Sequence, residues 1–323
     1  RFANDDYDLD NFEGFRLNLA DHIAAITASD IPTSSSWDMT MKEGKSFDAT
    51  VTVKEMRGVD EELTARLYMG EEVIGTATGS VAANGTETLT ITATPTTAAT
   101  EGIEMHIEVE YAGGTLTTEA VTRYVAALTY LVLDESSSDA IVAGTYDHVT
   151  LKRAFNAGWN SVCLPFTVSD VEAFFGEGAK AFEFTSYDED GLLSFSVTST
   201  LTASYPYVIY LPEAISEDFS LTDITIATAD REPFIFHKGS IYLRGTYAPV
   251  AAGGWDKSAD TDAIYGVTAQ GRIQRAGENA SIKGFRAYFD VPAETEVKGL
   301  FFEDMEDGSL EVLNVVNIRR PLA

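Results

Sequence analysis

Basic residues are scarce in this chain. Its 323 residues include 22 Lys and Arg against 51 Asp and Glu, which gives a formal net charge of −29. Unaided binding to nucleic acid needs a basic surface that replaces the phosphate counterions, and docking on an anionic membrane needs clusters of Lys and Arg. The charge excludes the first partner and argues against the second. Apolar residues make up 45% of the chain and charged residues 23%, which is typical of a folded protein.

Cysteine and long apolar runs are also lacking. Cys163 is the one cysteine in the sequence, which excludes an internal disulfide framework and a cysteine-built zinc site. No stretch approaches about 18 uninterrupted apolar residues, so we predict no transmembrane segment. A signal peptide or lipid anchor would precede Arg1.

Sequence motifs for catalysis are missing. There is no Gly-x-Ser-x-Gly elbow, no His-Glu-x-x-His, no phosphate loop and no Rossmann glycine pattern. Cys163 lies between Val162 and Leu164 in a strand-like run, which predicts a buried structural thiol, with a nucleophile as the alternative. We therefore assign no catalytic residue and expect a protein that is not an enzyme.

The first 30 residues differ from the rest, and we expect an acidic tail or linker over 1–30. A short helix is the alternative there, because Leu19, Ile23 and Ile26 share one face at helical spacing. Asp6, Asp8 and Asp10 have the 1, 3, 5 spacing of a calcium loop, but Asn11 and Leu17 replace its glycine and its bidentate glutamate. The pattern favours a solvated segment without a cofactor, and calcium remains the alternative.

Period-two alternation begins after residue 30 and predicts an immunoglobulin-like β-sandwich over 31–129. Three clear runs lie at 47–54, 88–94 and 103–110, with apolar side chains on one face and polar ones on the other. Turn pairs separate the runs: Gly70-Glu71, Asn84-Gly85 and Gly113-Gly114.

The remaining residues, 130–323, predict a second, larger β-sandwich or open barrel with one short helix. Of the 35 aromatic residues, 25 follow position 130. We expect seven strands here: 182–187, 192–197, 205–211, 240–247, 282–291, 297–302 and 310–315. The helix is predicted over 169–175, with a Ser169/Glu172 capping box and Gly176 as its stop. The predicted fold class is all-β.

Aromatic side chains are the best binding candidates, because a sugar ring has an apolar face on which Trp or Tyr can stack. Trp255 lies in a polar loop, Tyr205 and Tyr207 flank Pro206, and Tyr265 follows an acidic loop. These four residues form the predicted ligand site. The other tryptophans, Trp37 and Trp159, are expected to fill cores, and core filling is also the alternative for the four.

Several ordered blocks resemble the C-terminal β-domain of large surface or secreted proteins of the Bacteroidetes, some of which are named for cell adhesion. The blocks are Tyr130–Glu135, Val149–Arg153, Trp159–Phe166, Phe174–Phe184, Gly245–Val250 and Ile282–Phe289. The preceding region is similar to adhesion-related immunoglobulin-like modules through Gly44–Val53 and Leu67–Val73.

This resemblance implies an exported protein at the cell surface or outside the cell, with a non-catalytic role in adhesion or display. The partner would be a glycan or a host or extracellular protein. Two alternatives stay open, namely a carbohydrate-binding module for polysaccharide capture and a structural spacer for an upstream domain.

Overall fold

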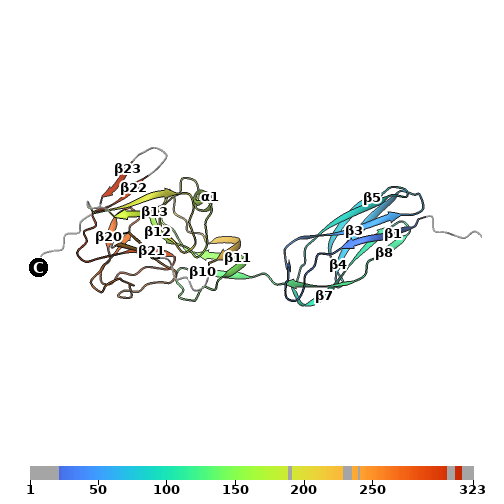
Figure 1. Cartoon of the computed structure of the whole chain (residues 1–323), viewed down its shortest axis with the longest axis horizontal. Coiled ribbons are helices and arrows are strands. Elements are labelled where there is room, and N and C mark those ends of the chain that lie inside the picture. The colour runs from blue at the N-terminus through green and yellow to red at the C-terminus, as the bar shows by residue number, and fades with distance from the viewer. Residues whose placement is uncertain (1–21, 188–190, 228–234, 239–240, 304–309, 315–323) are drawn as a thin grey trace, which may run out of the picture. The chain divides into compact units, whose positions relative to one another are not determined.

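The computed structural model describes residues 22–187, 191–227, 235–238, 241–303 and 310–314. The fold class is all-β, as predicted, and the described residues contain one short helix, α1 (Val171–Phe175). The chain divides into two compact units, Arg1–Leu128 and Thr129–Ala323 (Figure 1). Within the described residues, no helix has the length and apolar character of a membrane span.

The first unit contains nine strands in the order β1-β3-β6-β5-β4-β7-β9-β2, with β8 paired to β7. Their bounds are β1 (Ala24–Asp30), β2 (Met41–Lys42), β3 (Phe47–Glu55), β4 (Glu61–Met69), β5 (Glu72–Val81), β6 (Thr86–Ala93), β7 (Ala99–Tyr111), β8 (Gly114–Thr117) and β9 (Val121–Ala126).

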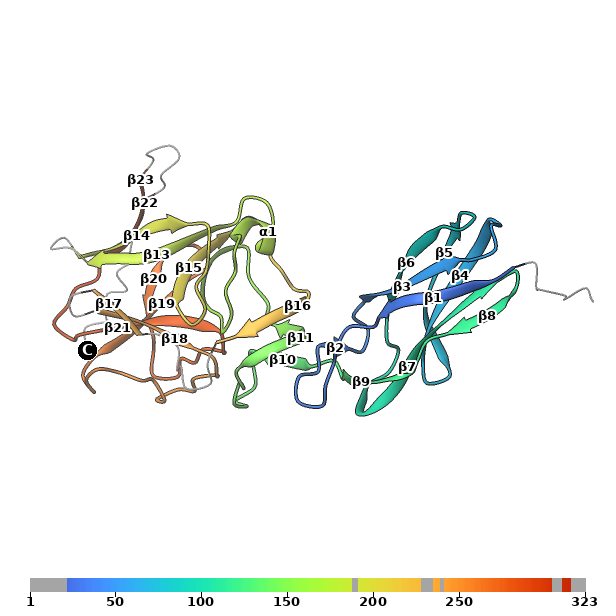
Figure 2. The same cartoon turned by 45° about the vertical axis from the view of Figure 1, so that its right-hand side comes forward.

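These strands form the two layers of a sandwich (Figure 2). Strands β5 and β6 share only the register pair Gly75↔Ala93, so the sheet folds over on itself there. Alternate residues point inward, among them Val51, Leu67 and Ile107, and they join one continuous core. The predicted alternation over 47–54, 88–94 and 103–110 is confirmed by β3, β6 and β7.

The short helix considered near residue 23 is wrong for the described residues. Residues 24–30 form strand β1, which pairs antiparallel with β3. Ala24 is buried and Ile26 packs on the same core, so their two-residue spacing is that of a strand. Leu19 lies outside the described residues.

A buried carboxylate fixes one end of this sandwich. Glu55 accepts the backbone N–H groups of Arg57, Gly58 and Asn84 at 2.6, 2.8 and 2.7 Å. Burial alone would raise the pKa of Glu55, but these N–H donors outweigh it and lower the pKa. The predicted turn at Asn84-Gly85 is confirmed, and Asn84 has a φ of 58°.

The second unit contains three sheets, of three, six and five strands. The first is β10-β11-β16, built from β10 (Tyr130–Asp134), β11 (Gly144–Lys152) and β16 (Phe219–Ile226). The second is β12-β15-β13-β14-β22-β23, with bounds Gly158–Cys163, Pro206–Leu211, Lys180–Tyr187, Leu192–Thr198, Gly299–Glu303 and Leu310–Asn314. The third is β17-β18-β21-β19-β20, with bounds Ile235–Lys238, Ile241–Thr246, Arg286–Val291, Ala263–Val267 and Ile273–Arg275.

Two hydrophobic cores hold these sheets together. One contains Phe155, Phe166 and Phe285, and the other contains Phe184, Phe195 and Phe289. Trp159 belongs to the second core with 9% of its surface exposed, as expected. Trp37 does not fill a core, because it is 86% exposed on the segment between β1 and β2. The sequence carries no alternation at that position that would reveal its orientation.

The cap of α1 differs from the predicted capping box. Asp170 is the N-cap, and its side chain accepts from Ala173 N at 2.9 Å. Glu172 instead accepts from Gly178 N, so it fixes the turn that follows the helix. Gly176 ends the helix with a φ of 108°, as predicted.

A polar junction joins segments of the second unit that lie far apart in the sequence. Buried Glu135 lies 2.7 Å from both Lys283 Nζ and Arg286 Nη1. Buried Arg153 donates to the carbonyl of Phe285, and Phe285 has a φ of 58°, which is unusual for an aromatic residue. Segments far apart in the sequence therefore meet at this one place.

Gly284 lies at the tightest point of this junction. A Cβ atom there would lie 2.2 Å from the carbonyl oxygen of Tyr247 and 3.2 Å from that of Glu135. Gly284 N also donates to the Glu135 carbonyl at 2.7 Å. Only a residue without a side chain fits this approach.

Candidate functional site

The five-stranded sheet has one face in the second core and an outer face that is itself largely covered. Its register pairs Tyr265 with Phe289 and Leu243 with Phe289, and Leu243 and Phe289 lie in the core. Directly paired residues share a face, whereas neighbours along a strand point to opposite faces. The outer face therefore carries the alternate residues, which are Arg244, Ile264, Gly266, Gln274, Tyr288 and Asp290.

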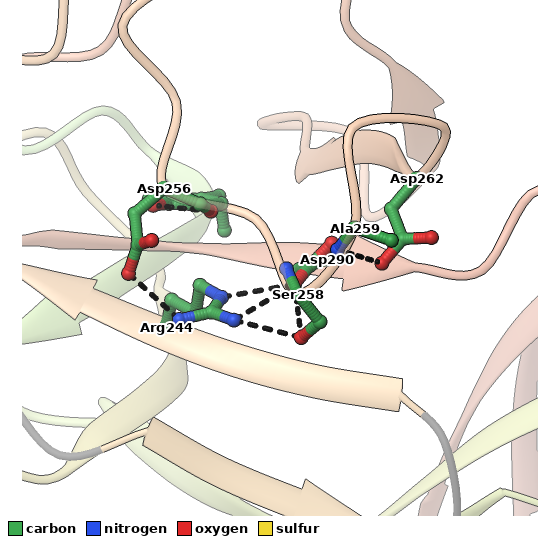
Figure 3. Close-up of polar contacts among 7 residues, drawn as sticks. Arg244, Asp256, Ser258, Ala259, Asp262 and Asp290 are labelled. Atoms are coloured by element: carbon green, nitrogen blue, oxygen red, sulfur yellow. Dashed lines mark hydrogen bonds and ion pairs between the residues drawn. The ribbon is translucent and has the colours of Figure 1, made fainter.

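The loop between β18 and β19 covers part of this outer face and is held by a buried charge pair (Figure 3). Arg244 lies 2.9 Å from the fully buried Asp290 through Nη2 and 2.8 Å from Asp256 through Nη1. Ser258 donates to Asp290 Oδ2 through its backbone N–H at 2.7 Å and its hydroxyl at 2.8 Å. The loop is thus fixed at two points, Asp256 and Ser258.

A second contact orders the rest of the loop. The side chain of Asp262, which is 7% exposed, accepts from Ala259 N at 3.0 Å. Asp262 is the residue before β19, so this bond closes the loop onto the start of that strand. This local hydrogen bond from backbone to side chain stabilises a segment that has no strand hydrogen bonds of its own.

Trp255 is the aromatic residue of this loop, and its position is fixed by Tyr288. The two rings are 5.0 Å apart with an interplanar angle of 72°, an edge-on contact. The Tyr288 hydroxyl donates to the carbonyl of Asp256 at 3.2 Å. Burial and the nearby Asp256 raise the pKa of Tyr288 to about 12, so the phenol keeps its proton at neutral pH. Trp255 itself is half-buried and retains an open surface.

A first depression of about 310 Å³ opens beside Trp255, which is close to the lower limit of common ligand pockets. Trp255 and Ile264 are apolar parts of its lining, and Gly266 leaves open space where a Cβ would meet no atom within 4 Å. Gln274 and Ser281 add an amide and a hydroxyl group to the lining. The cationic Arg275 also lines this depression. An apolar ring surface beside hydrogen-bonding groups is chemistry that suits a sugar ring.

A second depression of the same volume, about 310 Å³, lies against the same tryptophan. It shares Trp255, Ile264, Arg275, Ala276 and Gly277 with the first one. Its other lining residues include the charged Lys257, Asp262 and Glu278. The two depressions are therefore contiguous and differ in polarity.

The four predicted ligand residues are not brought together. Trp255 is central to both depressions, and strand β19 with Tyr265 lines the first. Because Tyr265 pairs with Phe289, its ring lies on the core face and packs against the second core. Tyr265 thus contributes to the shape of the depression, and its ring does not form a stacking surface there.

Tyr205 and Tyr207 belong elsewhere in the second unit. Tyr207 is 5% exposed in a core, and its hydroxyl accepts from Thr202 N at 3.1 Å. Tyr205 packs against the same core. We therefore correct the prediction for Tyr207, which offers no ring face to a ligand, and leave Tyr205 out of the candidate site.

The remaining predicted site residues are Cys163 and the acidic residues of the calcium alternative. Cys163 is fully buried, burial raises the pKa of its thiol, and Sγ donates to the carbonyl of Ser204 at 3.3 Å. This confirms a structural thiol. No group of three or more His, Cys, Asp or Glu residues is arranged around a metal position in the described ranges. Asp6, Asp8 and Asp10 lie outside those ranges.

The supporting residues Arg244, Tyr288 and Asp290 were not recognised from sequence. Arg244 and Asp290 are 46 positions apart and meet only because β18 pairs with β21. One signal was available: Asp290 interrupts the apolar run Ala287–Val291, where an unpartnered carboxylate would be costly.

Comparisons with known proteins find only weak structural similarities. No protein-family model matches the chain, and a search of curated proteins finds no match. Among solved structures, the chain is similar to WR4, an MSP family member of C. elegans, with 15% identity, a TM-score of 0.18, and coverage of 32% of this chain and 96% of that one. Red sea bream transglutaminase has 12% identity and a TM-score of 0.20, over 70% of this chain and 28% of that enzyme. Likenesses this weak carry no weight for fold or function.

Proposed function

We propose that this chain is a non-catalytic, exported binding protein with a role in adhesion or display, and that its second unit binds carbohydrate beside Trp255. One observation carries the proposal: a half-buried tryptophan lines two depressions with neutral and charged polar groups around it. The resemblance to Bacteroidetes surface proteins supports the location and the adhesive role.

The rigidity of the loop favours recognition. Trp255 is flanked by Asp256, which is tied to Arg244 and to Tyr288, so little freedom remains to be lost when a ligand is bound. The spacer alternative predicts buried aromatics and no groove, and the surroundings of Trp255 favour a binding role instead.

The test is a binding screen of the full chain against immobilised glycans and extracellular matrix proteins, with calcium and with a chelator. We expect saturable glycan binding that Trp255→Ala reduces at least ten-fold. The matched control is Trp37→Ala, which removes an exposed tryptophan from the first unit and should leave binding unchanged.

Other outcomes separate the alternatives. Binding lost only with chelator would assign the calcium site to Asp6, Asp8 and Asp10. Binding to a matrix protein that survives Trp255→Ala would place adhesion on another surface. No binding at high concentration would favour the spacer, and release of sugar from a bound glycan would contradict a non-catalytic role.

A further inference from the structure

The two depressions beside Trp255 have a common wall. Trp255, Ile264, Arg275, Ala276 and Gly277 line both of them, so the two depressions adjoin one another at Trp255. Each has a volume of about 310 Å³, and neither is large compared with pockets that enclose a whole drug-sized ligand. The shared residues thus lie between two depressions of equal volume.

The polar groups of the two compartments differ. Gln274 and Ser281 line only the first depression, where the outer face of β19 and β20 adds the empty position of Gly266. Lys257 and Glu278 line only the second, and Arg275 lines both. A ligand that fills both must carry hydroxyl groups along its length, with an apolar face where it passes Trp255.

We infer that the ligand is a linear oligosaccharide that crosses Trp255 and places one sugar unit in each depression. This inference rests on the proposed carbohydrate function and adds the ligand's length to it. Trp255 stacks at the boundary between the two units, Gln274 and Ser281 bond hydroxyls of one unit, and Lys257 and Glu278 bond hydroxyls of the other.

Binding should therefore depend on chain length. Titration of the full chain with neutral gluco-, xylo- and manno-oligosaccharides, from mono- to hexasaccharide, would measure this dependence by calorimetry. For the series that binds, affinity should rise at least ten-fold from monosaccharide to disaccharide and then level off, because further units extend beyond the two depressions.

Two variants test the depressions separately. Gly266→Leu fills the first one, and the open space at this Cβ lets the fold tolerate a larger side chain. Glu278→Ala removes a polar group from the second. Each should lower trisaccharide affinity several-fold, whereas Gly266→Ala should have a smaller effect than Gly266→Leu. Glu294→Ala, at an exposed acid outside both depressions, is the matched control and should change nothing.

The results also distinguish this inference from the function on which it rests. If a monosaccharide binds as tightly as its trisaccharide and Trp255→Ala still abolishes binding, the function stands and the two-compartment inference is overturned. Unchanged trisaccharide affinity in both Gly266→Leu and Glu278→Ala, with unchanged melting temperatures, would overturn it as well. If no saccharide of any length binds, both fail together.

Discussion

The two units each bury a carboxylate next to a loop, but they use it differently. Glu55 in the first unit accepts only backbone N–H groups and closes a turn at the end of the sandwich. Asp290 in the second unit accepts from a guanidinium and from a serine at two atoms, and so holds a long loop on the outer face of a sheet. The first arrangement completes a fold, whereas the second also positions Trp255 for contact with a ligand.

The same contrast appears in the cores. The first unit has one continuous core of mostly aliphatic side chains, and its long strands leave little surface in loops. The second has three sheets, two cores and aromatic contacts throughout. The shorter strands of the second unit are joined by longer loops, and one of these loops contains Trp255. Binding surfaces are commonly found on loops held by a rigid scaffold, which favours the second unit as the binding unit.

The largest effect is expected from a cavity in the first unit. Ile107 is fully buried in β7, and Ile107→Ala should lower the free energy of unfolding of that unit by about 2–5 kcal/mol through lost packing and an unfilled cavity. Hydrogen–deuterium exchange on the full chain would locate the change. Faster exchange in β18–β21 of the same variant would contradict the view that each unit has its own core.

A smaller but still large effect is expected at Gly284 in the second unit. The Cβ of Gly284→Ala would lie 2.2 Å from the carbonyl oxygen of Tyr247, so the backbone must move, at a cost of about 1–3 kcal/mol. Calorimetric melting measures it. Gly277→Ala is the control, because its Cβ would meet no atom within 4 Å, and a similar loss of stability there would refute the steric explanation.

The pH dependence of the first unit should come partly from Glu55. The pKa of Glu55 is lowered from the usual 4.5 in the folded protein. Its contribution to the free energy of unfolding is therefore complete above pH 4.5 and is lost as the pH falls through the folded pKa. The melting temperature of the first unit should therefore fall below about pH 4.5. Glu55→Gln should lower it by several degrees at pH 7 and flatten this part of the profile, and an unchanged profile would assign the acid sensitivity to other carboxylates.

The smallest effect is expected at Trp37. Because this side chain is 86% exposed, Trp37→Ala should change the free energy of unfolding by less than about 0.5 kcal/mol. Chemical denaturation followed by circular dichroism is sufficient to measure it. A loss comparable to that expected for a buried tryptophan such as Trp159 would show that Trp37 is covered in solution.

The sequence predicted those features that depend on neighbouring residues. Alternation located β3, β6 and β7, and the predicted turn at Asn84-Gly85 is present with a φ of 58° at Asn84. Trp255, which the sequence places in a polar loop, is half-buried in the structure.

Features that depend on distant residues could not be predicted in this way. Which face of β19 receives Tyr265 is decided by its pairing with Phe289, and the burial of Tyr207 is decided by the segments packed over β15. The Asp170 cap was missed because Ser169 fits the same motif one position earlier. The local alternation of residues therefore predicts the strands, whereas the composition of the candidate site depends on how distant strands pair.

The buried thiol of Cys163 has a practical consequence for these measurements. It is the one cysteine of the sequence, it has no exposed surface, and it lies in β12 of the second unit. A thiol reagent can reach it only when that unit opens, so the labelling rate reports the frequency of opening in the unmodified protein. The first unit contains no cysteine, so the labelling rate of Cys163 reports the opening of the second unit and is independent of the opening of the first.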